Sequence, residues 1–468
     1  MPALMVQGAS SSAGKSLLAT ALCRLCHRRG IDVAPFKAQN MSNNARVVSG
    51  GEIGTAQYLQ ALAAGLEPDV RMNPILVKPE GDSQSQVIVL GKPDLELSRL
   101  PWRARSERLW PPIEESLKSL QAEHELLLIE GAGSPAEINL RSSDLANMRT
   151  AKATQARVVL LADIDRGGAF ARLYGTWALL PPDEQALLAA FVLNKFRGTR
   201  ALLPPGPQLL EQLTGVPTIG VLPWLVHGLP DEDGAGEPER TGQRPLVAVV
   251  RYPTASNLDE FRPLEQVADL RWASIPADLA GAELVVLPGS KHVAADLAWL
   301  TEHGFPAALT ERIARGGRVL AICGGLQMLG ERIIDEGGVD GSAEALGLLP
   351  LETTFAQAKR TEHTTARFPA LAEPWTSLSH RKLSGYEIRH GRTTAAAPVG
   401  VALPDGLGYV SGPLLGIYLH GLFEQPEMVT ALIGASPGRS LNRVFDELAD
   451  AVEEHLAVDQ LLEQVAVV

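Results

Sequence analysis

The chain has 468 residues, of which 45% are hydrophobic and 21% charged, and its formal net charge is −12. This length exceeds one ordinary hydrophobic core, so two or three globular domains are expected. The acidic balance argues against a nucleic-acid partner, and no apolar run approaches the length of a membrane span. Without a secretory leader pattern the expected compartment is the cytoplasm, and three cysteines give no disulfide framework.

The chain begins with a predicted strand, loop and helix. A short apolar run at residues 3–6 is followed by a small-residue loop that starts at Gly8, and apolar residues then recur at helical spacing over 17–25. The loop closes on Gly14, Lys15 and Ser16. This layout predicts a phosphate-binding loop, in which backbone N–H groups and a lysine surround phosphate oxygens and a serine hydroxyl can ligate Mg²⁺. Five residues separate the two glycines, and this longer loop resembles that of dethiobiotin synthetases.

Charged side chains stand at the ends of two further predicted strands. Lys37 follows a strand at 33–36, and Glu130 ends an apolar run and precedes a glycine turn. Because strand ends line the ligand crevice of an open α/β sheet, Lys37 is placed to meet a transferred phosphoryl group and the carboxylate that attacks it. Glu130 is placed to coordinate Mg²⁺ opposite the phosphate loop.

Two other acidic positions enter the predicted metal site. Glu52 lies at the start of a helix expected from about residue 53 to 66, and with Ser16 and Glu130 it would form a small site of hard oxygen ligands. Asp163 and Asp165 follow another apolar strand. Whether these two carboxylates assist the metal or meet the substrate is left open.

Several segments of the first half resemble the cobyric acid synthase family. They are the loop 8–16 and residues 35–42, 73–79 and 130–135. The more distant likeness to dethiobiotin synthetases implies the ATP-site and metal roles of Lys37, Glu52 and Glu130. It also implies that Asn194, at the end of a strand, reads the adenine edge.

The second half starts after residues 227–245, a Gly-, Pro- and charge-rich stretch that predicts an interdomain linker. A buried strand at 318–322 then runs into Cys323 and two glycines. A cysteine at such a strand-to-helix corner has its sulfur exposed at the N-terminus of the helix, and this position favours the thiolate. His420 follows another apolar strand and is the predicted general base.

Cys323 and His420 resemble the nucleophile and base of class I glutamine amidotransferases. That resemblance implies an oxyanion hole formed by the backbone amides of Gly289 and Gly324. Typical members carry a glutamate two residues after the histidine, but Leu422 stands there. Glu424 could orient the imidazole only if the chain turns back.

Two regions of the second half carry no assigned role. Lysines and arginines crowd residues 359–392, which predicts either a solvated face or a lip for substrate carboxylates. The tail from about 441 to 465 has apolar residues at helical spacing, and we expect it to pack on the second domain.

The resemblance covers nearly the whole chain and implies its architecture. Residues 1–226 would form a doubly wound parallel sheet of dethiobiotin synthetase type, a P-loop ATP-dependent synthetase domain. Residues 246–468 would form a flavodoxin-like class I glutamine amidotransferase domain.

The same resemblance implies the reaction. ATP and glutamine would drive amidation of four peripheral carboxylates of adenosylcobyrinic acid a,c-diamide, through an acyl phosphate and glutamine-derived ammonia, in cobalamin biosynthesis. ATP and Mg²⁺ are the implied cofactors, and glutamine and the corrinoid are the implied partners.

Two alternatives stay open. Cobyrinic acid a,c-diamide synthases share both domain types, although residues 39–42 favour the first assignment. A partitioning-type ATPase switch could be fused to an inactive glutaminase fold. Such switches usually carry an extra lysine early in the phosphate loop, where this chain has Ala9 and Ser10.

Overall fold

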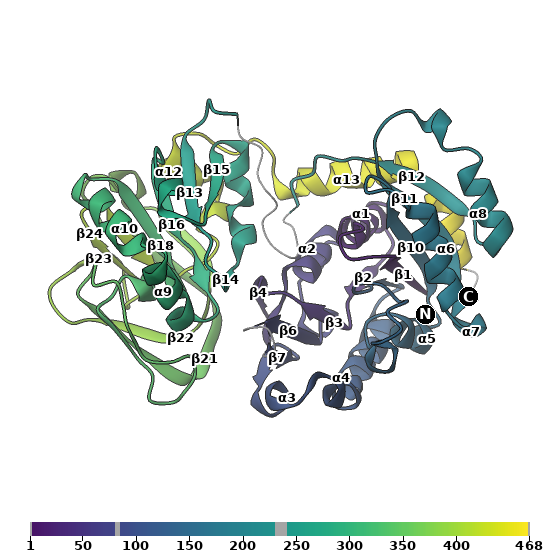
Figure 1. The fold of residues 1–468 in the computed structure, drawn as a ribbon, viewed down its shortest axis with the longest axis horizontal. Coiled ribbons are helices and arrows are strands. Elements are labelled where there is room, and N and C mark those ends of the chain that lie inside the picture. The colour runs from purple at the N-terminus through teal and green to yellow at the C-terminus, as the bar shows by residue number, and fades with distance from the viewer. Residues whose placement is uncertain (1, 80–84, 230–240, 467–468) are drawn as a thin grey trace.

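The computed structural model describes residues 2–79, 85–229 and 241–466, which form two α/β halves side by side (Figure 1). The centre of the predicted linker, residues 230–240, lies outside the described part. The first half is built on a six-stranded parallel sheet of order β12-β11-β10-β1-β9-β2. Its strands are β1 (Ala3–Gly8), β2 (Val33–Phe36), β9 (Leu126–Glu130), β10 (Arg157–Asp163), β11 (Leu188–Phe196) and β12 (Thr218–Pro223).

Helices cover both faces of this sheet, which is why its central strands are apolar almost throughout. The two faces bury separate hydrophobic clusters, one around Met5 and Phe36 and the other around Leu4 and Leu18. The helices of this half are α1 (Lys15–Arg28), α2 (Thr55–Ala63), α3 (Leu95–Arg99), α4 (Trp102–Glu123), α5 (Met148–Thr154), α6 (Ala169–Leu179), α7 (Pro182–Gln185) and α8 (Gly206–Thr214).

Two small elements, an antiparallel hairpin and a mixed four-stranded sheet, extend the first half toward the second. One is the hairpin of β4 (Ala45–Val48) and β5 (Gly51–Gly54), and the other adds β3 (Gln39–Met41), β6 (Ile75–Pro79), β7 (Ser85–Val89) and β8 (Lys92–Asp94), of which β3 and β6 are parallel. The predicted helix near Glu52 is wrong at its start, because Glu52 lies in β5 and α2 begins at Thr55. Gly50, with a φ of 92°, makes the tight turn that lets β4 and β5 pair before the helix starts.

The second half contains a seven-stranded sheet of order β15-β13-β16-β18-β25-β24-β23. Its first five strands are parallel, and β24 and β23 add to the edge in antiparallel fashion. These strands are β13 (Leu246–Val250), β15 (Asp269–Ala273), β16 (Leu284–Leu287), β18 (Arg318–Ile322), β23 (Gly400–Leu403), β24 (Gly408–Ser411) and β25 (Leu414–Ile417). Its helices are α9 (Val293–Glu302), α10 (Phe305–Ala314), α11 (Gly324–Met328) and α12 (Pro426–Ile433).

A second sheet in this half faces the first half of the chain (Figure 1). It consists of β19 (Arg332–Ile334), β20 (Ala343–Glu344), β21 (Leu351–Arg367) and β22 (Lys382–Ala395), and a short pair joins β14 (Ala255–Ser256) to β17 (Gly289–Ser290). The long strands β21 and β22 contact the β4–β5 hairpin. One such contact joins His363 Nε2 to the carbonyl oxygen of Val47 at 2.9 Å.

The C-terminal helices do not pack where the sequence predicts. Helices α13 (Leu441–His455) and α14 (Val458–Ala466) cross back to the first half, where α13 lies along α1 (Figure 1) and α14 contacts β11. The apolar side of α13, including Phe445, completes the cluster that contains Leu18. Arg24 Nε lies 2.7 Å from Asp446 Oδ1 at the same junction. The expected packing on the second half is therefore wrong, because the partner of this apolar face is α1.

Across the described residues, none of the helices combines the length and the apolar character that crossing a bilayer requires.

Candidate active sites

The predicted phosphate loop joins β1 to α1 and is closed by Gly14, whose φ is 101°. A side chain cannot replace that glycine, because a Cβ atom there would lie 2.1 Å from Asn194 Nδ2. Lys15 Nζ reaches back over the loop to the carbonyl oxygens of Ser10 and Gly133, at 3.4 and 3.3 Å. The ammonium group is thus held at the mouth of the loop, where a phosphate oxygen would replace carbonyl oxygens as its partner.

Asn194 supports this loop in a way the sequence analysis did not assign. Its Nδ2 atom donates to the carbonyl oxygen of Ala13 at 2.8 Å, and its Oδ1 accepts from the backbone N–H of Lys195. Lys195 adds a second bond to the loop, from Nζ to the carbonyl oxygen of Ser12 at 2.7 Å. The phosphate loop is therefore held by two side chains at the end of β11, through Asn194 Nδ2 and Lys195 Nζ.

Glu130, at the end of β9, contacts two of the other expected residues, Ser16 and Lys37. Its Oε1 atom lies 2.9 Å from Ser16 Oγ and 2.9 Å from Lys37 Nζ. Its Oε2 atom accepts from Gln60 Nε2 at 2.5 Å. Lys37 and Glu130 are both buried, so this ion pair stands beside the phosphate loop in a medium that screens charge weakly.

Ser16 and Glu130 fit an Mg²⁺ ion, because a hydroxyl and a carboxylate are the hard oxygen donors that this ion prefers. Mg²⁺ in nucleotide sites is usually bound by one or two protein groups, with phosphate oxygens and water completing the shell. Within the described residues, no group of three or more His, Cys, Asp or Glu side chains is arranged to bind a metal on its own. Two protein ligands are therefore what this site offers.

Glu52 is not brought to this pair. It is fully buried at the interface between the two halves, where its two carboxylate oxygens contact Lys78 and Lys359. Burial opposes ionisation, but the two lysines outweigh it and lower the pKa of Glu52 to about 2. Its contacts make Glu52 part of the ionic contact between β5, β6 and β21, so the expectation that it joins Ser16 and Glu130 is corrected.

The predicted cysteine nucleophile lies at a sharp corner. Cys323 connects β18 to α11 with a φ of 51°, a left-handed conformation that costs energy in a residue other than glycine. This strained turn lifts the thiol to the end of the sheet. The following Gly325 could not carry a side chain, because a Cβ atom would lie 2.2 Å from the carbonyl oxygen of Leu287.

The two expected oxyanion-hole glycines lie next to the cysteine and the histidine. A Cβ atom on Gly289 would lie 2.8 Å from His420 Cε1, and one on Gly324 would lie 2.7 Å from the backbone nitrogen of Ser290. Gly289 therefore approaches His420 as closely as glycine allows, and Gly324, the residue after Cys323, packs equally tightly on Ser290. That the N–H groups of these two glycines donate to an oxyanion stays a prediction.

His420 is buried between three partners. The Cys323 thiol, which itself lies 3.8 Å from the carbonyl oxygen of Ile388, is close enough to influence the ionisation of His420. The imidazole stacks on Tyr386 with 5.3 Å between ring centroids. On the other side Nδ1 lies 2.8 Å from Glu260 Oε1. Burial favours the neutral ring, but Glu260 and Cys323 outweigh it and raise the pKa of His420 to about 10. The imidazolium form is thus favoured beside the thiol, as a thiolate requires.

Glu260 is the site residue that the sequence analysis missed. It lies in the 3₁₀ segment Leu258–Gln266, shortly after β13, and its Oε2 atom also accepts from the backbone N–H of Gly421. The two bonds fix the carboxylate against the imidazole. The sequence shows an acidic pair, Asp259 and Glu260, after the first strand of the second half, but no spacing relates that pair to His420.

Glu424, which the sequence left as a possible third member, points elsewhere. Its Oε1 atom contacts Arg46 Nη2 at 2.5 Å, and its side chain is 37% exposed. Glu260 holds the position beside His420 Nδ1 instead.

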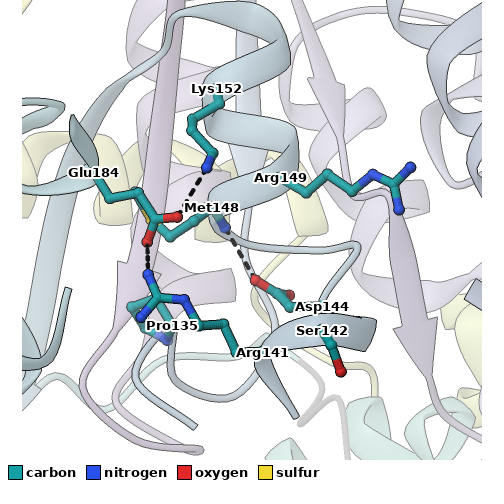
Figure 2. A pocket seen from close by; sticks show the side chains of 8 residues that line it. All are labelled: Pro135, Arg141, Ser142, Asp144, Met148, Arg149, Lys152 and Glu184. Carbon is teal, nitrogen blue, oxygen red and sulfur yellow. Dashed lines mark hydrogen bonds and ion pairs between the residues drawn. The ribbon is translucent and has the colours of Figure 1, made fainter. Parts of the chain in front are cut away.

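A cavity of about 330 Å³ opens beside the loop that follows Glu130 (Figure 2). It is lined by Pro135, Arg141, Ser142, Asp144, Met148, Arg149, Lys152 and Glu184. Its basic groups are already paired: Arg141 and Lys152 both contact Glu184, at 2.7 and 3.0 Å. The third basic group of the lining, Arg149, contacts Glu107 outside the cavity at 2.8 Å. Because each of these cations has a carboxylate partner, we assign no ligand to this cavity.

A P-loop nucleotide-binding half joined to a half with a buried Cys–His pair defines a glutamine-dependent amidoligase. Residues 4–231 match the model of the CobQ/CobB/MinD/ParA nucleotide binding domain, and residues 246–428 match that of the CobB/CobQ-like glutamine amidotransferase domain. Together with its identity of more than half to cobyric acid synthases over nearly its whole length, these matches show that the chain belongs to the cobyric acid synthase family.

Its relatives match over nearly their full length. It is 53% identical to a cobyric acid synthase of a Polaromonas species, over 97% of this chain and 96% of that protein. It is 56% identical to the cobyric acid synthase of Paracidovorax citrulli, over 96% of each. Among solved structures, PurLQS from Thermotoga maritima matches 44% of this chain and 98% of its own length, at 18% identity and a TM-score of 0.32, too low to carry an argument.

Proposed function

We propose that the chain converts adenosylcobyrinic acid a,c-diamide to adenosylcobyric acid by amidating four peripheral carboxylates with ATP and glutamine. The observation that carries this proposal is the presence, in one chain, of two reaction centres. One is the phosphate loop whose Ser16 meets Glu130, and the other is the Cys323–His420 pair. The near full-length match to cobyric acid synthases supports this assignment over either alternative left open by the sequence.

In the second half, the Cys323 thiolate attacks the side-chain amide carbon of glutamine. The backbone N–H groups of Gly289 and Gly324 stabilise the oxyanion that forms. His420 passes its proton to the departing nitrogen and the carbon–nitrogen bond breaks. Ammonia is released, and the glutamyl group stays bound to Cys323 as a thioester. Water then hydrolyses the thioester to glutamate and restores the thiol.

In the first half, a corrinoid carboxylate attacks the γ-phosphorus of ATP, the bond from that phosphorus to the bridging oxygen of the β-phosphate breaks, and ADP leaves. The carboxylate thereby becomes an acyl phosphate. Lys15 and Lys37 reduce the repulsion between the two anions as they approach. Ser16 and Glu130 would hold Mg²⁺, which supplies further charge neutralisation on the phosphates. Asn194 keeps the loop in shape. Ammonia then displaces phosphate and leaves an amide.

The test is to incubate the protein with ATP, Mg²⁺, glutamine and the corrinoid, and to follow the corrinoid by mass spectrometry. We expect stepwise conversion of four carboxylates to amides, with phosphate released in step. A corrinoid that stays unmodified while glutamine is consumed would contradict the proposed substrate. The cytoplasmic location expected from the composition stays a prediction.

A further inference from the structure

Arg46 belongs to the first half of the chain but reaches the glutaminase centre of the second. It stands on β4 and is 4% exposed. Its Nη2 atom contacts Asp259 Oδ2, and the same nitrogen lies 2.5 Å from Glu424 Oε1. Asp259 is itself buried, so Arg46 compensates a charge that would otherwise be costly at this place.

The backbone beside Arg46 is joined to the same part of the second half. The N–H of Ala45 donates to Asn257 Oδ1 at 3.2 Å, and Asn44 Oδ1 accepts from the N–H of Leu258 at 3.2 Å. Residues 44–46 are therefore bonded to residues 257–259 at three successive positions. The residue after Asp259 is Glu260, whose carboxylate contacts His420.

Two short routes lead from Arg46 to His420. One passes through Asp259 to its neighbour Glu260, whose Oε1 atom lies 2.8 Å from His420 Nδ1. The other passes through Tyr386: the Arg46 guanidinium lies 5.2 Å from the centroid of that ring, which stacks on the imidazole. Arg46 therefore contacts Tyr386, which stacks on His420, and it contacts Asp259, the chain neighbour of Glu260.

Nine residues before Arg46, the same stretch of chain begins in the ATP site with Lys37. Lys37 contacts Glu130 beside Ser16, and only residues 38–45 separate it from Arg46. Within that stretch β3 pairs with β6, which fixes its path between the two centres. Residues 37–46 therefore run from one reaction centre to the other.

We propose that Arg46 is a positioning residue for glutamine hydrolysis and that segment 37–46 couples the glutaminase centre to the nucleotide-binding half. Arg46 fixes Asp259 and Tyr386, and through them Glu260 and His420, so the Cys323–His420 pair is fully ordered only with β4 in place. Of the proposed function, this inference requires only the hydrolysis of glutamine and not the identity of the amidated substrate.

The test compares glutamine hydrolysis by the full-length protein and by Arg46→Ala, without corrinoid. We expect kcat to fall about 10- to 100-fold, because a charge-assisted contact that orders the base is lost. The KM for glutamine should change little, since Arg46 acts through other residues. Arg46→Lys should recover part of kcat. Arg108→Ala, which removes an exposed ion pair with Glu96, is the matched control and should behave as wild type.

A second measurement separates positioning from general damage. Ammonium-driven amidation by Arg46→Ala should equal that of wild type, because the phosphate loop and Glu130 are untouched. Equal losses in both activities, or unchanged glutamine hydrolysis, would overturn the inference. A wild-type protein that hydrolyses glutamine but leaves the corrinoid unmodified would instead count against the proposed substrate, and the hydrolysis assay would still decide the role of Arg46.

Discussion

Glu260 Oε1 lies 2.8 Å from His420 Nδ1 although the two residues are 160 positions apart in the chain. The carboxylate fixes which ring nitrogen faces away from Cys323 and favours a protonated imidazole. It thus takes the place that a glutamate shortly after the histidine has in typical class I glutamine amidotransferases.

Glu260→Gln keeps the shape of the side chain and removes its charge. We expect glutamine hydrolysis to fall by about 10²–10⁴-fold, as when the carboxylate partner of another catalytic histidine is neutralised. Glu424→Ala should have a mild effect, since Glu424 contacts Arg46 and not the imidazole. Steady-state glutaminase assays compare the two. A larger loss in Glu424→Ala than in Glu260→Gln would reverse their roles.

The pH profile gives a second test of the same contact. The pKa of His420 is raised to about 10, so its charged form persists from neutral pH up to that value. Without the Glu260 charge the pKa of His420 falls, and the imidazolium is lost at a lower pH. The alkaline limb of kcat/KM for glutamine should therefore move to lower pH in Glu260→Gln. An unmoved limb would show that Glu260 does not set this ionisation.

Lys15→Ala tests the phosphate loop. Losing one preorganised donor at a site of developing charge typically costs about 10²–10³-fold in rate. We expect that loss in corrinoid amidation with either glutamine or ammonium, while glutamine hydrolysis persists. Lys118→Ala removes an exposed lysine on α4 and serves as the control. Normal amidation by Lys15→Ala would remove the loop from the mechanism.

Glu130→Gln tests the proposed Mg²⁺ ligand. Removing the charge should raise the Mg²⁺ concentration needed for half-maximal amidation, because the amide is a weaker ligand for a hard cation. Glu52→Gln is the matched control, since Glu52 contacts two lysines and should leave the Mg²⁺ dependence unchanged. It should instead lower stability, because it leaves buried lysines without their counter-charge. A raised Mg²⁺ requirement in Glu52→Gln, with an unchanged requirement in Glu130→Gln, would show that Glu52 and not Glu130 binds the metal.

Phe445→Ala tests the packing of the C-terminal helices. Phe445 is 1% exposed in the cluster it shares with α1, and such a truncation costs about 3–5 kcal/mol. Hydrogen exchange should become faster in α1 and stay unchanged in β18. Leu441→Ala, on a residue that is 37% exposed, is the control on the same helix. Faster exchange confined to β18 would mean that the tail stabilises the second half.

Local patterns predicted the parts of this molecule that are local in the chain. The phosphate loop and the corner at Cys323 each lie within a continuous strand–turn–helix segment, and both form as expected. The place of Glu130 followed from a strand end, because parallel strands deliver their carboxyl ends to one edge.

The remaining features depend on contacts between distant segments. The carboxylate of Glu52 could ligate a metal as well as that of Glu130 could, and its role is determined by its contacts with Lys78 and with Lys359 of the other half. An apolar face such as that of α13 predicts burial but does not identify its partner. The partner of His420 could not be found from spacing, because the usual position holds Leu422 and the carboxylate comes from the start of the second half.

The central claim is that Cys323 serves only to release ammonia for amidation in the other half. Its most direct test follows the amide nitrogen of isotope-labelled glutamine into the corrinoid by mass spectrometry, with unlabelled ammonium present at alkaline pH. We predict labelled amides from the wild type and only unlabelled amides from Cys323→Ala, at a rate set by free ammonia. Labelled amides formed by Cys323→Ala would contradict this account.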